Sequence, residues 1–202
     1  MELHLIRHPR PDVAPGICYG QTDVGLAECP ATVADRLRPL LPESFALHAS
    51  PLSRARLLAE ALGKPRLDDR LKEIHFGDWE GRSFDDIGAA IDDWAADPLG
   101  FRAPGGESPR EMAARVLAWL AEHGVTAGNR GQTPISSEIG VCPLFRHPEH
   151  LVVVAHGGPL RAIAGHLLGL PPERWLGLDF GCGQVTRIDV ESWGVVLKWF
   201  NR

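Results

Sequence analysis

The sequence predicts an α/β fold, a three-layer α/β/α sandwich with a mostly parallel central sheet. Short apolar segments typical of strands alternate with segments of helical periodicity, which is the pattern of a parallel sheet covered by helices. The strongest apolar segment, 151–155, is rich in valine and bounded by polar residues, as expected of a central strand buried on both faces. With 202 residues, 44% hydrophobic and 23% charged, the chain suits a single domain spanning 1–202.

The N-terminal segment predicts one strand and one helix. Residues 3–6 form a buried strand that ends at residues 7–8, because the prolines at 9 and 11 cannot continue it. A turn-rich stretch follows, and helical periodicity then covers residues 30–41. The strand therefore ends on an arginine–histidine pair held in an extended conformation.

A second strand and helix follow. Residues 45–49 form the strand. Ser50 and Pro51 are expected to cap and open the helix, since serine is a favoured N-cap and proline is tolerated at the first helical position. Gly63 suits the C-terminal cap of this helix.

Two capping boxes predict two further helices. Ser108 with Glu111 opens the clearer one, and Ser83 with Asp86 opens the other. The inner face of the helix that begins after Ser83 is expected to carry Phe84, Ile87, Ile91 and Trp94.

The C-terminal part contains the central strand, a helix that follows the turn at 156–159, and a hairpin over 184–200. Before the central strand, residues 125–148 lack any helical or strand period, and we interpret them as an irregular insertion. Its apolar residues are expected to dock on the body or on a second subunit: Ile139, Val141, Leu144 and Phe145. A zinc site in this region has little support, because its candidate ligands are irregularly spaced: Cys142, His147 and His150.

Charge and cysteine content exclude several classes of protein. The net charge of −5 and the pI near 6.0 argue against a nucleic acid or a membrane surface as partner. No C-x-x-C pair is present among the four cysteines, so we expect reduced thiols. The N-terminus does not resemble a signal peptide, and no apolar run approaches the ~20 residues that span a bilayer. We expect a cytoplasmic protein.

Histidines stand at the ends of two predicted strands. His8 follows the first strand beside Arg7, and His156 follows the strongest strand. Ligands of open α/β sheets bind at the carboxyl ends of strands. The glycines after His156 open a helix whose free N–H groups favour an anion, and Arg54 can add a second guanidinium. The other histidines are expected to be structural or exposed: His4, His48, His75, His123, His147, His150 and His166.

Five segments together resemble the histidine phosphatase superfamily, in its phosphoglycerate-mutase-like branch. They stand in the family's order and span nearly the whole chain apart from the insertion: 5–8 (LIRH), 50–55 (SPLSRA), 71–81 (LKEIHFGDWEG), 104–108 (PGGES) and 153–158 (VVAHGG). The resemblance implies a phosphoglycerate-mutase-like fold.

The resemblance also implies roles for individual residues. His8 would be the nucleophile that becomes phosphorylated, and Glu73 would be the general acid. Glu80 is expected to be structural. The phosphate pocket would be completed by three side chains and one backbone N–H, those of Arg7, Arg54, His156 and Gly157.

The chemistry of these groups makes the roles plausible. Two nearby guanidinium groups disfavour the charged form of an imidazole, so His8 would be neutral and nucleophilic. Arg7, Arg54 and a cationic His156 would stabilise the phosphoryl charge, so neither a metal nor a cofactor is expected. Glu73 could protonate the leaving oxygen if burial and a bound phosphate dianion favour its protonated form, and it could then deprotonate the attacking water.

Two positions depart from the family's pattern. Pro9 stands where glycine is common after the nucleophile, and proline has no N–H to offer a phosphate. Ala14 stands near the place of a frequent asparagine. These changes predict that phosphate binding on this side is reduced or rebuilt by other residues.

The segment 18–23 narrows the choice of substrate. It resembles the corresponding turn of α-ribazole phosphatases, which remove a 5′-phosphate during cobalamin nucleotide-loop assembly. The turn residues expected to bind substrate are Tyr19, Gly20, Gln21 and Thr22. Residues 83–104 would form a cap over the site, as in relatives. A nucleoside-like base could stack on one of four aromatic residues, although each of them is more often part of a core: Tyr19, Phe84, Trp94 and Phe101.

Three hypotheses for function follow. The first is a phosphomonoesterase acting on a small phosphorylated metabolite, with α-ribazole 5′-phosphate as the best single candidate. The second is a phosphoglycerate mutase or a broad-specificity phosphatase, although a mutase must shield phosphohistidine from water and this chain is short of the elements for that. The third is a non-catalytic phosphate-binding protein. The oligomeric state stays open, with a homodimer as one alternative.

Overall fold

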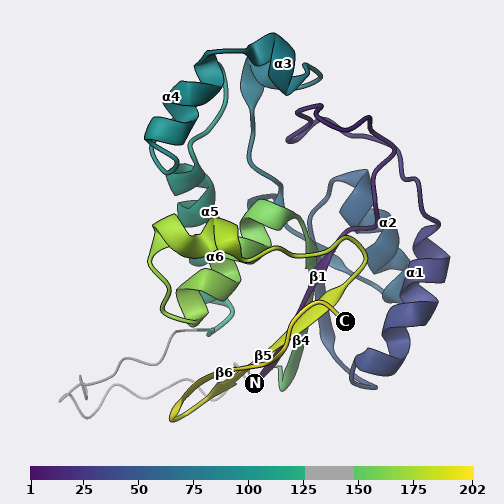
Figure 1. Cartoon of the computed structure of the whole chain (residues 1–202). Coiled ribbons are helices and arrows are strands. Elements are labelled where there is room, and N and C mark those ends of the chain that lie inside the picture. Colours follow the sequence, from purple (N-terminus) through teal and green to yellow (C-terminus); the bar gives the residue numbers. More distant parts are fainter. Residues whose placement is uncertain (126–147) are drawn as a thin grey trace.

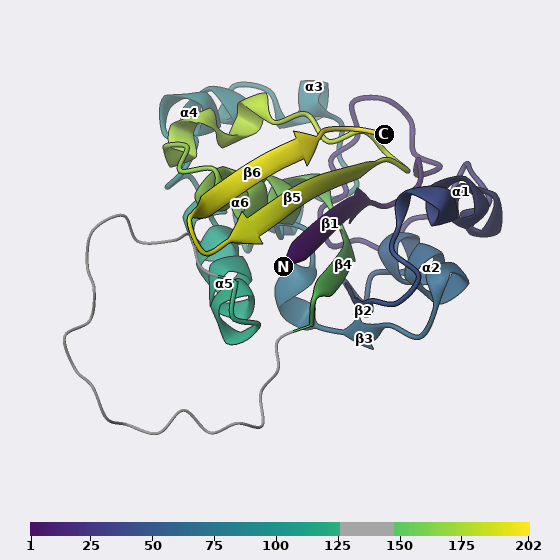
Figure 2. The same ribbon diagram turned by 90° about the horizontal axis from the view of Figure 1, so that it is seen from below.

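The computed structural model describes residues 1–125 and 148–202. The insertion expected at 125–148, its apolar cluster and two of the three candidate zinc ligands therefore lie outside the described residues. Figures 1 and 2 show a central sheet with helices on both of its faces.

Six strands form one mixed sheet in the order β3-β2-β4-β1-β5-β6. The strands β1, β2, β3 and β4 are mutually parallel, whereas β5 pairs antiparallel with both β1 and β6. This arrangement confirms the α/β prediction and the C-terminal hairpin. The bounds are β1 (Glu2–Arg7), β2 (Ala46–Ala49), β3 (Arg66–Leu67), β4 (His150–Ala155), β5 (Val185–Glu191) and β6 (Gly194–Trp199).

The helices form the two outer layers. The helices α5 (Pro109–Glu122) and α6 (Gly157–Leu167) share a core cluster with Leu5, whereas α1 (Pro30–Leu37) and α2 (Ser53–Leu62) share another with Ile6. Successive residues of β1 therefore face opposite layers, as the pleat of a strand requires. The short helices are η1 (Arg38–Leu40), η2 (Asp69–Leu71), η3 (Gly77–Trp79), α3 (Phe84–Ile87), α4 (Ala90–Ala96) and η4 (Pro172–Gly177).

The start of α2 differs from the prediction. The helix begins at Ser53 and has Leu52 as its N-cap, so Ser50 and Pro51 lie before it. The backbone N–H of Ser50 instead donates to the Val154 carbonyl at 3.0 Å and extends the pairing of β2 with β4. The expected cap was wrong because Ser50 still takes part in the hydrogen bonding at the C-terminal end of β2.

The segment after Ser83 also differs in part. The Ser83 side chain caps α3 as predicted, with its hydroxyl oxygen accepting from the Asp86 N–H at 3.0 Å. The expected single helix is divided, because Gly88 has φ +63° and ends α3 before α4 begins. Phe84 is exposed rather than on an inner face. The capping box of Ser108 and Glu111 at α5 is confirmed.

None of the helices in the described part of the chain has the length and hydropathy needed to cross a bilayer.

Candidate active site

The two strand-end histidines lie beside each other. The strands β1 and β4 are adjacent and parallel, with Arg7 opposite Ala155, so both chains leave the sheet at the same edge. The ring centroids of His8 and His156 are 5.1 Å apart. Arg54 donates to His156, and the charges of Arg54 and Arg7 both act on His8. We call Arg7, His8, Arg54 and His156 the histidine pocket.

His8 is buried and held in one tautomer. Its Nδ1 lies 2.7 Å from the carbonyl oxygen of Pro9. A carbonyl can only accept, so Nδ1 carries the hydrogen and Nε2 keeps a free lone pair. Burial lowers the pKa of His8 to about 3, and the charges of Arg54 and Arg7 act in the same direction. The expected neutral imidazole is therefore present, although desolvation contributes more to it than the guanidinium groups.

His156 is also neutral, contrary to expectation. The Nε of Arg54 donates to its Nδ1 at 3.2 Å, so Nε2 must carry the hydrogen, which points to the Ser50 hydroxyl at 2.7 Å. Complete burial lowers the pKa of His156 well below 6.5, and His8 and the arginines lower it further. The predicted cationic His156 was wrong, because sequence reasoning took no account of the cost of burying a charge among other cations.

Arg54 is fully buried at the start of α2. Besides its bond to His156, its terminal nitrogens donate to the carbonyl oxygens of Gly20 at 2.5 Å and Thr22 at 3.0 Å. The guanidinium also lies over the Tyr19 ring, 5.1 Å from its centroid. Three of its five N–H groups are thus bonded within the protein, which fixes the plane of the group.

The turn at 19–22, expected to bind substrate, forms the seat of Arg54. Glu80 holds this turn by accepting from the backbone N–H groups of Gln21 at 2.9 Å and Thr22 at 2.6 Å. Gly20 has φ +35°, and a Cβ there would lie 2.3 Å from a Glu80 oxygen. Glu80 therefore has a structural role, as the sequence suggested, and glycine is required at position 20.

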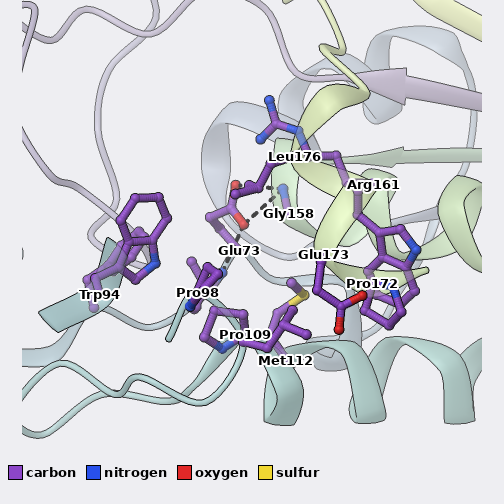
Figure 3. A pocket seen from close by; sticks show the side chains of 14 residues that line it. Glu73, Trp94, Pro98, Pro109, Met112, Gly158, Arg161, Pro172, Glu173 and Leu176 are labelled. Carbon is purple, nitrogen blue, oxygen red and sulfur yellow. Dashed lines mark hydrogen bonds between the residues drawn. The ribbon is translucent and has the colours of Figure 1, made fainter. Parts of the chain in front are cut away.

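Glu73 lies over the N-terminus of α6. Each of its carboxylate oxygens is 3.2 Å from the Gly158 N–H, and one also accepts from the Ile74 N–H at 2.9 Å, as Figure 3 shows in part. A Cβ at Gly158 would lie 2.3 Å from this carboxylate, so the second glycine permits the approach. The first glycine, Gly157, begins α6.

A clamp on the Glu73 backbone was missed by the sequence analysis. Arg115 of α5 donates to the carbonyl oxygens of Glu73 at 2.9 Å, Lys72 at 2.8 Å and Arg70 at 2.7 Å. Its Nε also donates to Glu107 at 3.0 Å, and Glu107 accepts from the His75 N–H at 3.0 Å. The glutamate of the PGGES segment was a visible signal for this clamp, whereas its arginine partner, eight residues later, was not.

A further guanidinium lies beside Arg7. The segment 178–180 holds both groups, since Phe180 accepts from Arg7 and Leu178 accepts from Arg161 at 2.8 Å. A Cβ on Gly157 would lie 3.1 Å from a terminal nitrogen of Arg161 and 3.7 Å from the Arg7 guanidinium carbon. Burial and Arg7 both lower the pKa of Arg161. Arg161 stands one helical turn after Gly157, and this spacing was the sequence signal that could have placed it beside the histidine pocket.

A cavity of about 170 Å³ opens beside Glu73 and Gly158. We call it the apolar cavity, because its walls come largely from Trp94, Leu99, Met112, Pro172, Trp175 and Leu176. Of the four aromatic candidates for stacking, Trp94 lines it. Phe84 is exposed, and Phe101 stacks on Trp79 at 5.2 Å inside a separate cluster. Trp175 of η4 was not foreseen.

The remaining candidates are placed as follows. His150 is paired with Glu2 at 3.1 Å, while Cys142 and His147 lie outside the described residues. Within residues 1–125 and 148–202, no group of three or more potential ligands is placed to hold a metal ion. Pro9 has no N–H, and its carbonyl oxygen serves His8.

The sequence matches the histidine phosphatase superfamily (branch 1) over residues 3–136 and 144–202. The chain belongs to this superfamily. Its members include phosphatases and mutases, and the neutral histidine with adjacent arginines fits both activities.

Relatives of this superfamily member have different names. A glucosyl-3-phosphoglycerate phosphatase of Mycobacterium tuberculosis is 31% identical over 201 residues, which cover 91% of this chain and 82% of the relative. A 2,3-bisphosphoglycerate-dependent phosphoglycerate mutase of a Methylobacterium species is 30% identical over 177 residues, covering 80% and 75%. A solved structure from Escherichia coli, provisionally named an alpha-ribazole-5′-P phosphatase, has a TM-score of 0.81 at 25% identity and covers 100% of this chain and 96% of its own.

Proposed function

We propose that this histidine phosphatase superfamily member is a metal-independent phosphomonoesterase that works through a phosphohistidine on His8. The observation that supports this most is the tautomer of His8. Its Nδ1 hydrogen is bonded to the Pro9 carbonyl, so the Nε2 lone pair is available to attack phosphorus without a prior proton transfer.

The surrounding groups can complete both half-reactions. Nε2 forms the bond to phosphorus as the ester oxygen leaves, and Glu73 gives that oxygen a proton, so that the alcohol departs neutral. Glu73 then takes a proton from water as the water oxygen attacks phosphohistidine, which releases phosphate and restores His8. Arg7, Arg54 and the N-terminus of α6 stabilise the phosphoryl oxygens in both steps.

The proposed substrate is a small phosphorylated metabolite, with α-ribazole 5′-phosphate as the best candidate. The turn at 18–23 and the similarity to the Escherichia coli structure support it. The apolar cavity beside Glu73 also supports it, since a nucleoside-like leaving group carries an uncharged ring. The segment 83–104, which supplies Trp94, would be the cap of this domain. We place the reaction in the cytoplasm and propose neither a nucleic acid nor a membrane as partner.

Phosphoglycerate mutase activity is the second candidate, favoured by the 30% identity to the Methylobacterium enzyme. Phosphate binding without catalysis is the third, favoured by the missing N–H at Pro9.

A single panel separates the three functions. Wild type and His8→Ala are incubated with α-ribazole 5′-phosphate, 3-phosphoglycerate and an aryl phosphate, and both phosphate release and isomerisation are measured. We expect phosphate release from α-ribazole 5′-phosphate that His8→Ala abolishes. Isomerisation of 3-phosphoglycerate would support the mutase. No turnover of any compound, with phosphate still bound, would support the non-catalytic alternative.

A further inference from the structure

The apolar cavity contains a second carboxylate besides that of Glu73. Its walls include the rings of Trp94 and Trp175, and Glu173 of η4 lies among them. Figure 3 shows Trp94 on one side and Glu173 on the other, with Glu73 and Gly158 between them. Glu173 is exposed to solvent, so a group that extends into the cavity past Glu73 meets the two rings and a solvated carboxylate on the cavity wall.

Arg161 is the one arginine among the residues that line the apolar cavity, and its guanidinium is bonded outside the cavity. Arg161 donates through Nε to the Leu178 carbonyl at 2.8 Å, and a terminal nitrogen lies 3.5 Å from the Asp179 carboxylate. Its other terminal nitrogen lies against Gly157, on the side of the histidine pocket. A negative charge deep in the apolar cavity would thus lack a free cationic partner there.

The two tryptophans are held in fixed positions. Trp175 donates its indole N–H to the Leu170 carbonyl at 3.0 Å and packs so closely on α6 that a Cβ at Gly165 would lie 2.2 Å from the ring. Trp94 packs against the cluster around Trp79. Rings that are already held in place by such packing offer apolar faces to a ligand at little entropic cost.

We propose that the apolar cavity selects phosphate esters whose leaving group is an uncharged ring system, and that Glu173 disfavours leaving groups that carry a carboxylate. This rests on the proposed function, which places the leaving group beside Glu73. A carboxylate in the cavity would lose water without gaining a cation and would face Glu173. Nucleoside-like esters are then good substrates, and esters of glyceric acid are poor ones.

Two phosphonates that differ by one carboxylate test this selection. Phenylphosphonate and 4-carboxyphenylphosphonate carry a C–P bond in place of the ester, so calorimetry measures binding without turnover. We expect the wild type to bind phenylphosphonate about tenfold more tightly than 4-carboxyphenylphosphonate, and this ratio of dissociation constants measures the selection. Glu173→Gln should reduce this ratio about threefold, and Glu173→Lys should reduce it further. Asp93→Asn removes the same charge from α4 at a residue outside the cavity, and it should leave the ratio unchanged.

Trp94→Ala tests the ring contact separately. It should weaken phenylphosphonate about tenfold while inorganic phosphate binds as before. The inference is overturned if the wild type binds both phosphonates equally, if neither Glu173 variant changes the ratio, or if Trp94→Ala weakens phosphate and phenylphosphonate alike. Hydrolysis of phenyl phosphate by wild type and His8→Ala tests the proposed function independently. Absent turnover with intact discrimination would refute the hydrolase and support the selection.

Discussion

The histidine pocket and the apolar cavity meet at Glu73, yet they are built from different kinds of structure. The histidine pocket is formed at strand ends, and each of its four side chains is fixed by at least one hydrogen bond to a backbone carbonyl or to another side chain. The apolar cavity has walls from α4, α5 and η4, and it selects by shape and charge. The histidine pocket can bind the phosphoryl group of any phosphate ester, whereas the residues of the apolar cavity can differ among relatives with different substrates.

The largest effect should come from removing the nucleophile. His8→Ala should lower kcat for every ester at least about 10³-fold, since the other imidazole of the histidine pocket, His156, already uses its lone pair to accept from Arg54. Phosphate release is the measurement, and His166→Ala, which removes an exposed histidine of α6, is the control. Retention of a tenth of the wild-type rate by His8→Ala would remove the histidine pocket from the chemistry.

Glu73→Gln should slow the reaction of esters with a basic leaving group more than that of esters with an acidic leaving group. An alkyl phosphate needs protonation of its leaving oxygen, so its phosphorylation step should slow about 10²-fold or more, whereas a dinitrophenyl ester should be affected much less in that step. Burst kinetics measure this step directly. Glu60→Gln on the surface of α2 is the control. Equal effects on both esters would contradict a general acid at position 73.

Arg115→Lys should reproduce this pattern on a smaller scale. Lysine cannot reach three carbonyl oxygens and Glu107 together, so the Glu73 backbone would be less well fixed. We expect about a tenfold loss of kcat for the alkyl ester and a smaller loss for the dinitrophenyl ester. Arg102→Lys at the exposed pair with Glu111 is the matched control. A loss that ignores the leaving group would mean that Arg115 acts on stability alone.

The smallest effect at neutral pH concerns stability. Burial lowers the pKa values of His4, His8 and His48 to about 4, 3 and 4, below the 6.5 of the unfolded chain. Below pH 6.5 the unfolded chain therefore binds protons that the folded chain does not. The free energy of unfolding should fall as the pH drops from 6.5 towards 4, by up to about 1.4 kcal/mol per pH unit for each histidine.

Urea unfolding at several pH values measures this dependence. His48→Gln should reduce the slope by about one proton, while Trp94→Leu in the apolar cavity should lower stability equally at each pH. A wild-type free energy that is constant between pH 6.5 and 4.5 would contradict the buried neutral histidines.

The contrast between the two regions also explains what could be predicted from the sequence. The strand 151–155 and the proline-terminated strand before His8 carry strong local signals, and parallel strands place their ends together, so the histidine pocket could be predicted. The charge of His156 could not, because it depends on how deeply the ring is buried.

The apolar cavity depends on contacts between distant segments. Trp175 lines it because Gly165 lets the ring pack on α6, and Trp94 reaches it because Gly88 divides the expected helix and redirects α4. Neither consequence has a periodic signature in the sequence. The seat of Arg54 at residues 19–22 was likewise missed, because those residues hold it through backbone carbonyls, which every residue type provides.

The most direct test is to trap the phosphoryl group. Glu73→Gln is reacted with a dinitrophenyl phosphate, quenched in base and analysed by mass spectrometry. The water that attacks phosphohistidine lacks its general base in this variant, so the phosphorylated intermediate should accumulate. We expect one base-stable, acid-labile phosphoryl group per chain, on His8. A phosphoryl group on any other residue, or product formed in many turnovers with no label on His8, would contradict it.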